Sequence, residues 1–323
     1  MLQPLYTSHM AMPRILTLTM NPALDRATTA ARVEPTHKLR CSQPVLFSGG
    51  GGVNVARVLH RLGADVSALY TTGGPAGTVL RRLLDQEGVP SLCVPIADDT
   101  RENLAVIDRS NGNEYRFVMP GPQMTEAEWH ACLDAVAALS PAPEWIVASG
   151  SLPLGVPQDF YVRLAEIARR HGSRLVLDSS GPELAAALNA GVYLVKPSLR
   201  ELRELSGLPL NDAPAWEAAA LGLVHRQQAQ IVALSLGDQG AMLACAQGVW
   251  HVPALSVNVA GATGAGDSFV AGMVWALMQD LGPGQALRWA VAAATAALLT
   301  HGTSLAHPED MRRLLEQVPP APF

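Results

Sequence analysis

Short apolar runs separated by longer segments with helical periodicity make up most of the chain. The helical pattern is clearest over residues 158–170 and 183–189. The apolar runs lie at residues 15–19, 65–70, 145–148, 174–177, 192–195 and 231–235. Strands that alternate with helices are typical of βαβ units, in which a mainly parallel sheet is covered by helices on both faces. The sequence therefore predicts an α/β fold.

Residues 27–47 and 101–118 break this rhythm. In the second segment, apolar and polar residues alternate on both sides of Ser110-Asn111-Gly112-Asn113. An Asn-Gly pair between two alternating runs is typical of a β-hairpin. Because such segments do not fit readily into a parallel sheet, we expect them to form a small antiparallel β lid beside the main domain.

Composition narrows the class of protein. The 323 residues are 49% hydrophobic with a formal net charge of −5, which excludes a disordered chain and argues against a nucleic-acid partner. The longest apolar run, residues 289–299, is shorter than the ~20 residues of a membrane span, so we expect a buried helix and no membrane partner. The four cysteines are far apart and form no CxxC pair, which predicts neither zinc nor disulfides and favours the cytoplasm.

The boundaries follow from the same patterns. We expect one α/β domain over residues 13–317, including the lid segments, and a tail at 318–323. Residues 1–12 lack the basic and apolar regions of a secretory signal. We interpret them as a cloning remnant or a disordered start, and they do not enter the fold prediction.

Small polar and charged residues follow most of the apolar runs. In an open parallel sheet, ligands bind beyond the carboxyl ends of the strands, which is where these residues are expected. They are Asn21, Asp25, 149–151, 178–180, 196–198 and 235–237. An ordinary loop or cap explains any one of them, but explains the joint pattern less well. Only two of the 23 basic residues are lysines, Lys38 and Lys196, which hints that a compact ammonium group is needed at both places.

The strongest motif is Gly264-Ala265-Gly266-Asp267-Ser268, which precedes an apolar helical run over residues 269–278. Glycines let backbone amides approach a ligand, and a helix N-terminus directs unpaired N–H groups at an anion. An aspartate in that first turn could accept a proton from an attacking hydroxyl. The alternative is that Asp or Ser merely caps the helix. The motif is neither a Walker A loop nor a dinucleotide GxGxxG.

Two further glycine motifs are weaker. Residues 49–57 read Gly-Gly-Gly-Gly-Val-Asn-Val-Ala-Arg and could admit a substrate against bare backbone, with Asn54 bonding to sugar hydroxyls. Residues 235–243 form a glycine-rich turn between two apolar runs, whose hydroxyl and amides could hold nucleotide phosphates. Taken alone, a flexible turn and a plain hairpin explain them equally well.

Together these motifs resemble the phosphofructokinase B family of the ribokinase superfamily. The resemblance extends from about residue 14 to residue 304. The matching segments, in order, are Met20-Asn21-Pro22-Ala23-Leu24-Asp25, residues 49–57, Ser149-Gly150-Ser151-Leu152-Pro153, Val195-Lys196-Pro197 and Gly264-Ala265-Gly266-Asp267. The resemblance implies a ribokinase-like fold and ATP-dependent phosphorylation of a sugar phosphate. It also implies a homodimer in which two lids pair.

Within that family, Gly51 stands where 1-phosphofructokinases and tagatose-6-phosphate kinases typically carry a lysine. The all-glycine form, together with Lys38, resembles the ATP-dependent 6-phosphofructokinase branch of enteric bacteria. This favours phosphorylation of the 1-hydroxyl of fructose 6-phosphate, as in glycolysis. The other two sugar-phosphate kinase activities remain alternatives.

The resemblance implies a role for individual positions. Asp267 resembles the base that takes the sugar's proton, and Gly264, Ala265 and Gly266 resemble the anion hole. Positions that hold the sugar and its phosphate match Asp25, Lys38, Gly50, Gly51, Asn54, Arg101, Gly150 and Ser151. ATP would lie across Lys196, Ser198, Ser235, Gly237, Gly240, Val291 and Thr295. Mg²⁺ would bridge the ATP phosphates and be positioned largely through water by Glu201.

The sequence departs from the family pattern at two places. Ser198 replaces the asparagine of an Asn-x-x-Glu motif, and Gly261-Ala262 replaces an Asp-Thr pair that helps to hold a monovalent cation in relatives. The second change puts activation by K⁺ in question. These losses leave a catalytically impaired sensor of sugar phosphate or nucleotide as an alternative, which the retained Asp267 argues against. A nicotinamide-dependent oxidoreductase would need a GxGxxG after the first strand, and the sequence has none there.

Overall fold

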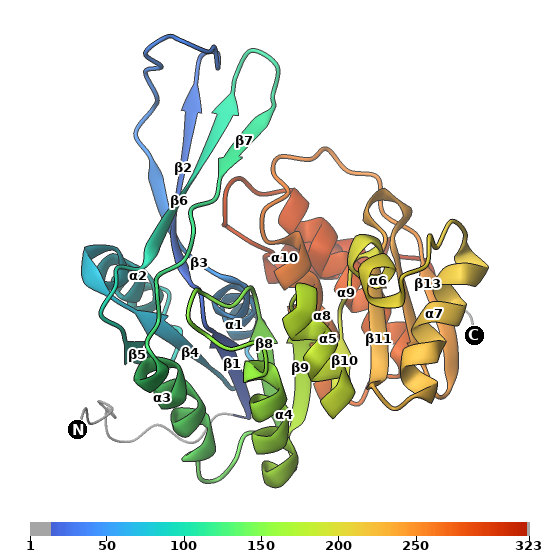
Figure 1. The fold of residues 1–323 in the computed structure, drawn as a ribbon. Coiled ribbons are helices and arrows are strands. Elements are labelled where there is room, and N and C mark those ends of the chain that lie inside the picture. The colour runs from blue at the N-terminus through green and yellow to red at the C-terminus, as the bar shows by residue number, and fades with distance from the viewer. Residues whose placement is uncertain (1–13, 322–323) are drawn as a thin grey trace.

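A computed structural model of the chain describes residues 14–321 (Figure 1). The interpretation of residues 1–12 therefore falls outside the described part, as do the last two residues of the predicted tail. Two sheets and the helices around them make up the described residues, and the smaller sheet projects from the main body.

Within residues 14–321, the larger sheet has nine strands in the order β13-β12-β11-β10-β9-β8-β1-β4-β5. Neighbouring strands from β11 to β5 run parallel, and β12 and β13 continue the sheet in antiparallel fashion. The strands are β1 (Ile15–Thr19), β4 (Val66–Thr72), β5 (Ser91–Pro95), β8 (Trp145–Ser149), β9 (Arg174–Asp178), β10 (Val192–Val195), β11 (Ala229–Ser235), β12 (Ala241–Cys245) and β13 (Gly248–Val252). All six apolar runs are strands, so the predicted α/β class is confirmed.

Helices cover both faces of this sheet. One face packs against α1 (Gly51–Arg61), α2 (Gly74–Gln86), α8 (Ala265–Met278), α9 (Pro283–Leu298) and α10 (Pro308–Leu315). The other packs against α3 (Glu126–Ala137), α4 (Phe160–His171), α5 (Gly181–Ala190), α6 (Leu199–Ser206) and α7 (Ala213–His225). Strand β8 is buried between them, because Trp145 and Val147 join the first core while Ile146 and Ala148 join the second.

The apolar run at 289–299 belongs to α9, as predicted, and its residues are largely buried. Among the helices of residues 14–321, none combines the length and the apolar character needed to cross a membrane.

The smaller sheet is the predicted lid, with the strand order β3-β2-β6-β7 within the described part of the chain. It comprises β2 (Ala23–Ala30), β3 (Val45–Gly49), β6 (Arg101–Asp108) and β7 (Glu114–Phe117). Strands β6 and β7 form the expected hairpin, but the central pair, β2 and β6, runs parallel, so the sheet is mixed. The reason is that β2 follows β1 and β6 follows β5, and both therefore leave the carboxyl edge of the main sheet in the same direction.

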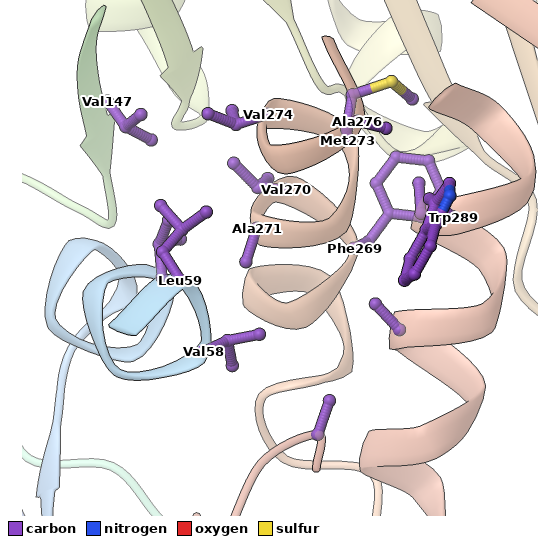
Figure 2. Packing of buried hydrophobic residues seen from close by; sticks show 14 of the residues in the cluster. Val58, Leu59, Val147, Phe269, Val270, Ala271, Met273, Val274, Ala276 and Trp289 are labelled. Atoms are coloured by element: carbon purple, nitrogen blue, oxygen red, sulfur yellow. The ribbon is translucent and has the colours of Figure 1, made fainter. Parts of the chain in front are cut away.

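Helix α8 lies between α1 and α9 and is the centre of the first core (Figure 2). Its Val270 and Ala271 lie near Val58 and Leu59 of α1, while Phe269 lies near Trp289 of α9. The α8–α9 contact is so close that a Cβ added at Gly272 would meet Trp289 O at 2.7 Å and Ala293 Cβ at 2.8 Å. The glycine is therefore needed for packing rather than for its backbone freedom.

This packing predicts opposite effects for two helical glycine substitutions. Gly272→Ala should destabilise the fold by about 1–3 kcal/mol, because the α9 backbone must move to admit the methyl group. Gly222→Ala in α7 should stabilise the fold by about 0.4–1 kcal/mol, because alanine reduces the conformational freedom of the unfolded chain. In the folded protein the new methyl group meets only the end of the flexible Arg226 side chain, at 3.1 Å. Urea unfolding of both variants measures the difference. Shifts of the same sign would contradict the packing account.

Candidate active site

The N-terminus of α8 forms an open cradle of backbone amides. Gly264 is the N-cap in the left-handed region (φ 78°), and a Cβ there would meet Leu305 Cδ2 at 2.2 Å, so only glycine fits. A Cβ at Gly266 would meet nothing within 4 Å, which shows that this side of the turn is open. The first-turn N–H groups of Ala265, Gly266 and Asp267 have no carbonyl within the helix to bond to. They can therefore stabilise an anion that binds at this end of the helix.

Asp267 is half-buried in this first turn and faces α1. Its Oδ2 accepts a hydrogen bond of 2.8 Å from Nδ2 of Asn54, a buried residue of α1. Burial raises the pKa of Asp267 to about 7, and the charges of Asp178 and Asp25 act in the same direction. The Asn54 hydrogen bond and the Lys196 ammonium oppose that rise. A carboxylate with a pKa near 7 can both take and give up a proton at neutral pH.

The glycines at the start of α1 are explained by packing. A Cβ at Gly51 would meet Ser149 Oγ at 2.3 Å, and one at Gly50, whose φ is 112°, would meet Thr19 Cγ2 at 2.8 Å. Bare backbone therefore brings α1 against the ends of β1 and β8. On the side where a Cβ would lie, the space beside these Cα atoms is filled by protein.

Asp25 on β2 lies on the wall of a pocket between the lid and the loops that precede α8 and α10. Its Oδ1 accepts from Asn103 Nδ2 at 2.9 Å, and its Oδ2 accepts from Thr303 Oγ1 at 2.8 Å. The pocket is lined by these three residues together with Thr263, Gly302 and neighbouring lid residues. Within the described residues, the buried hydroxyl of Thr263 has no hydrogen-bond partner. A polar ligand such as a sugar hydroxyl can satisfy it.

Arg101 is the first residue of β6 and lies close to Asn21, which follows β1. It donates from Nη2 to Asn21 O at 3.0 Å and from Nη1 to Met119 O at 3.2 Å, and burial lowers the pKa of the guanidinium. Its buried Nε has no partner among residues 14–321. Lys38, in contrast, lies exposed in the loop between β2 and β3, and within the described chain it makes no hydrogen bond or ion pair. The two predicted phosphate ligands therefore differ in how far the fold positions them.

The turn after β8 is rigid. Gly150 has a φ of 110°, and its carbonyl accepts from Tyr161 Oη at 3.0 Å and from Ser179 Oγ at 3.1 Å. Ser151 Oγ accepts from Asn21 Nδ2 at 3.1 Å. This turn and Asn21 thus hold together the ends of β8 and β1, as expected for neighbouring parallel strands.

Lys196 is buried beside Asp178, and its Nζ lies 3.0 Å from Asp178 Oδ1. Burial works against the charge of the ammonium, but the adjacent Asp178 carboxylate outweighs it and raises the pKa of Lys196. Ser149 Oγ donates to the other oxygen of Asp178 at 3.2 Å. The side chain of Lys196 is therefore held as a fixed positive charge near Asp267.

The remaining nucleotide-side residues lie around the ends of β10 and β11. Ser198 and Glu201 form a capping box on α6, in which Ser198 N donates to Glu201 Oε2 at 2.7 Å. Ser235 N donates to Pro197 O at 3.0 Å, which joins this cap to the turn that follows β11. In that turn, Gly237 and Gly240 both have positive φ. The turn is a hairpin from β11 to β12 in which Leu236 N, Gln239 N and Gly240 N bond to carbonyls of the turn itself, while Gly237 and Asp238 are exposed.

Val291 and Thr295 are the two predicted nucleotide-side residues that the structure does not bring to the ends of β10 and β11. Both are buried, Val291 belongs to the first core, and Thr295 Oγ1 donates to Val291 O within α9. Because α9 is apolar on nearly every side, the sequence pattern did not show which face is exposed. Ala294 and Leu298 of the same helix are only partly buried.

The sequence analysis did not single out Asn103, Thr303 or Arg57, although all three take part in the hydrogen bonds around the site. The alternation of apolar and polar residues along β6 could have pointed to Asn103. Thr303 lies in a loop without a motif, so no such signal existed for it. Asp178 was visible only as a residue at the end of an apolar run. What connects these residues is contact between distant segments, which no local pattern reports.

Comparison with known proteins agrees with this geometry. The family model for pfkB family carbohydrate kinases matches residues 18–310. The chain is 43% identical over 304 residues to the ATP-dependent 6-phosphofructokinase isozyme 2 of Mycobacterium tuberculosis, a match that covers 94% of this chain and 89% of that protein.

Two crystal structures of phosphofructokinase-2 from Escherichia coli are also similar. The complex with substrates and products superposes with a TM-score of 0.91 at 38% identity, covering 94% of this chain and 99% of the other. The complex with potassium gives a TM-score of 0.90 at 39% identity, covering 95% and 99%. The chain described here therefore belongs to the pfkB family of carbohydrate kinases.

Proposed function

We propose that this protein transfers the γ-phosphoryl group of ATP to the 1-hydroxyl of fructose 6-phosphate, producing fructose 1,6-bisphosphate and ADP. The observation that carries the proposal is Asp267, a carboxylate with a pKa near 7 placed at the amide cradle of α8 and beside the pocket of Asp25. A base and an anion hole at one helix N-terminus are what phosphoryl transfer to an alcohol needs.

In this mechanism Asp267 accepts the proton of the sugar's 1-hydroxyl while that oxygen attacks the γ-phosphorus. The bond between the γ-phosphorus and its bridging oxygen breaks, and ADP leaves with the electron pair. The amides of Gly264, Ala265 and Gly266 face the charge that develops on the transferred group. Lys196, held by Asp178, adds a fixed positive charge on the nucleotide side.

On the sugar side, Asp25 and Asn54 are placed to bond hydroxyls, and Gly50 and Gly51 allow α1 to approach the strand ends. For the 6-phosphate we propose Lys38, Arg101, Gly150 and Ser151. An arginine fork and a lysine point charge both suit a phosphate. Arg101 is already in place, whereas Lys38 must reach the ligand through movement of the lid or from a paired subunit.

The nucleotide would lie across Lys196, Ser198, Ser235, Gly237 and Gly240. A divalent metal fits beside them, because one oxygen of Glu201 is used by the capping box and the other has no partner among the described residues. Mg²⁺ prefers one or two carboxylates together with substrate phosphates and water. Within residues 14–321 no cluster of three His, Cys, Asp or Glu side chains could hold a metal alone, which agrees with a site that the ATP phosphates complete. Bound there, Mg²⁺ would neutralise phosphate charge.

The choice of fructose 6-phosphate rests on Gly51. A side chain at this position would run into Ser149, so the lysine that the family resemblance associates with 1-phosphofructokinases and tagatose-6-phosphate kinases has no room here. All four cysteines are unpaired, which supports a place in the cytoplasm, where thiols stay reduced.

The lid presents an apolar surface. Its exposed large apolar residues are Leu39, Val45, Tyr115, Phe117, Val118 and Met119. Phe117 and Val118 are 48% and 59% exposed, and contiguous exposed apolar residues usually mark an interface. We propose that this surface pairs with its counterpart in a homodimer.

The substrate proposal predicts a clear order in an ADP-release assay with Mg-ATP. Fructose 6-phosphate should have the highest kcat/KM among fructose 6-phosphate, fructose 1-phosphate and tagatose 6-phosphate. Fructose, which lacks the phosphate, should be turned over far more slowly. Because Gly261 and Ala262 offer no side-chain oxygen, adding potassium should change the rate little. A preference for another sugar phosphate overturns the substrate assignment, and no turnover on any supports a sensor.

The pKa of Asp267 predicts the pH dependence. Only the ionised carboxylate is a base, so kcat/KM should fall about tenfold per pH unit below pH 7. Asp267→Asn should bind ATP with ordinary affinity, as measured by calorimetry, but turn over about 10²–10⁴-fold more slowly and lose this acid limb. Near-normal turnover of the variant would mean that another group is the base.

The dimer proposal predicts that a charge on the lid surface weakens association. Phe117→Asp should sediment as a monomer at concentrations at which the unmodified protein is a dimer. Leu208→Asp, at an equally exposed apolar residue between α6 and α7, should leave the dimer intact. A monomeric unmodified protein at working concentration would refute the proposal.

A further inference from the structure

Arg57 in α1 is a buried cation that the mechanism above does not use. Its side chain is 1% exposed, and it forms an ion pair of 2.8 Å with Glu87, the C-cap residue that follows α2. Burial lowers the pKa of this guanidinium, and Glu87 opposes the change. A charge is costly to bury unless it is fully hydrogen-bonded, so the contacts of Arg57 should reveal what it is for.

One nitrogen of Arg57 faces the active site. Its Nη1 donates to Ser48 O and to Thr303 O, both at 2.9 Å, and lies 3.4 Å from Asn54 Oδ1. Ser48 belongs to β3 and Thr303 to the loop before α10, so the guanidinium joins three segments that are far apart in sequence. Both Asn54 and Thr303 in turn bond to the acidic residues of the site.

The contact with Asn54 fixes which way its amide points. A guanidinium has donors only, so it must face the amide oxygen. The NH₂ group then points the other way, toward Asp267 Oδ2 at 2.8 Å. Rotated by half a turn, the amide would set its NH₂ against the Arg57 donors and its oxygen against the carboxylate, which is unfavourable at both ends. The two N–H groups of Nη1 serve Ser48 O and Thr303 O, and the longer contact to Asn54 Oδ1 acts through the positive charge of the guanidinium, which gives the order Arg57, Asn54, Asp267 a direction.

The second branch reaches Asp25. Arg57 holds the carbonyl of Thr303, whose hydroxyl donates to Asp25 Oδ2 at 2.8 Å. The same guanidinium thus supports the candidate base through one neighbour and the candidate sugar ligand through another.

We propose that Arg57 is a positioning residue that orients the Asn54 amide toward Asp267 and thereby keeps this carboxylate ionised near neutral pH. The inference rests on the proposed function, in which Asp267 is the base. The charged groups that face Asp267 are Asp178 from β9, Asp25 from β2 and Lys196 beyond β10. Against two carboxylates and one ammonium, a neutral donor that always points at Asp267 shifts the balance toward the ionised form.

The test compares Arg57→Lys with Arg61→Lys. Lysine keeps the charge but cannot reach Glu87 and the other three partners at once, because it lacks the planar fork. Arg61 is a matched control: it lies one turn along α1 and pairs with the same Glu87 at 3.1 Å. It also bonds the same loop at Ser304 O and Ala306 O, but it has no contact with Asn54.

In Arg57→Lys we expect the acid limb of kcat/KM for fructose 6-phosphate to move up by about one pH unit. That is a roughly tenfold loss of rate at pH 6 that largely disappears above pH 9. Arg61→Lys should keep the acid limb of the unmodified protein, even where its melting temperature falls as much. An unmoved limb in Arg57→Lys, or an equal shift in both variants, overturns the inference.

Two further measurements keep the test decisive. If Arg57→Lys does not fold, the double variant Arg57→Met/Glu87→Met removes the buried guanidinium together with its partly exposed partner and should shift the limb in the same way. Infrared titration of the Asp267 carboxyl, assigned by its loss in Asp267→Asn, reads the same shift without turnover. A protein that fails to phosphorylate fructose 6-phosphate refutes the proposed function, while the infrared titration still decides the role of Arg57.

Discussion

Helices α1 and α8 pack against each other through small and branched side chains, and this contact fixes the distance from Asn54 to Asp267 (Figure 2). Two glycines place these helices against their other neighbours: Gly51 lets α1 meet β8, and Gly272 lets α8 meet α9. Apolar packing thus sets a polar geometry. A shift of α8 by a fraction of an ångström would change both the hydrogen bond on Asp267 and the direction of the amide cradle.

The charges around this contact are mainly negative. Asp25, Asp178 and Asp267 converge on the carboxyl edge of the sheet, and Lys196 neutralises Asp178 at 3.0 Å. Burial raises the pKa of Asp267 to about 7, and the charges of Asp178 and Asp25 add to the rise. A structural ion pair and a reactive carboxylate therefore lie side by side: burial raises the pKa of both carboxyl groups, and Lys196 forms its ion pair with Asp178. The same logic separates the acid and base roles of paired carboxylates elsewhere.

Local patterns predicted the α/β class, the six strands of the main sheet that coincide with the apolar runs, the β6–β7 hairpin and the loop ending at Asp267. They did not predict that β2 and β6 run parallel, because that depends on where two distant strands leave the main sheet. The resemblance to the family, and no local pattern, placed Val291 and Thr295 at the nucleotide, and in the structure both side chains are buried in α9. Arg57 stood at the end of a glycine motif but had no assigned role, because its partners lie 9 to 246 residues away, apart from Asn54 one turn earlier.

The loop before α10 shows how the two halves of the site depend on one another. Leu305 is fully buried with a φ of 64°, a strained conformation for a leucine, and its side chain lies under Gly264. Two residues earlier, Thr303 bonds Asp25, and the Arg57 and Arg61 side chains bond the carbonyls of this loop. The loop therefore supports the amide cradle from below while it holds the sugar ligand. Strain of this kind persists only where surrounding contacts enforce it, and the hydrogen bonds from Arg57 and Arg61 to the carbonyls of this loop are among those contacts.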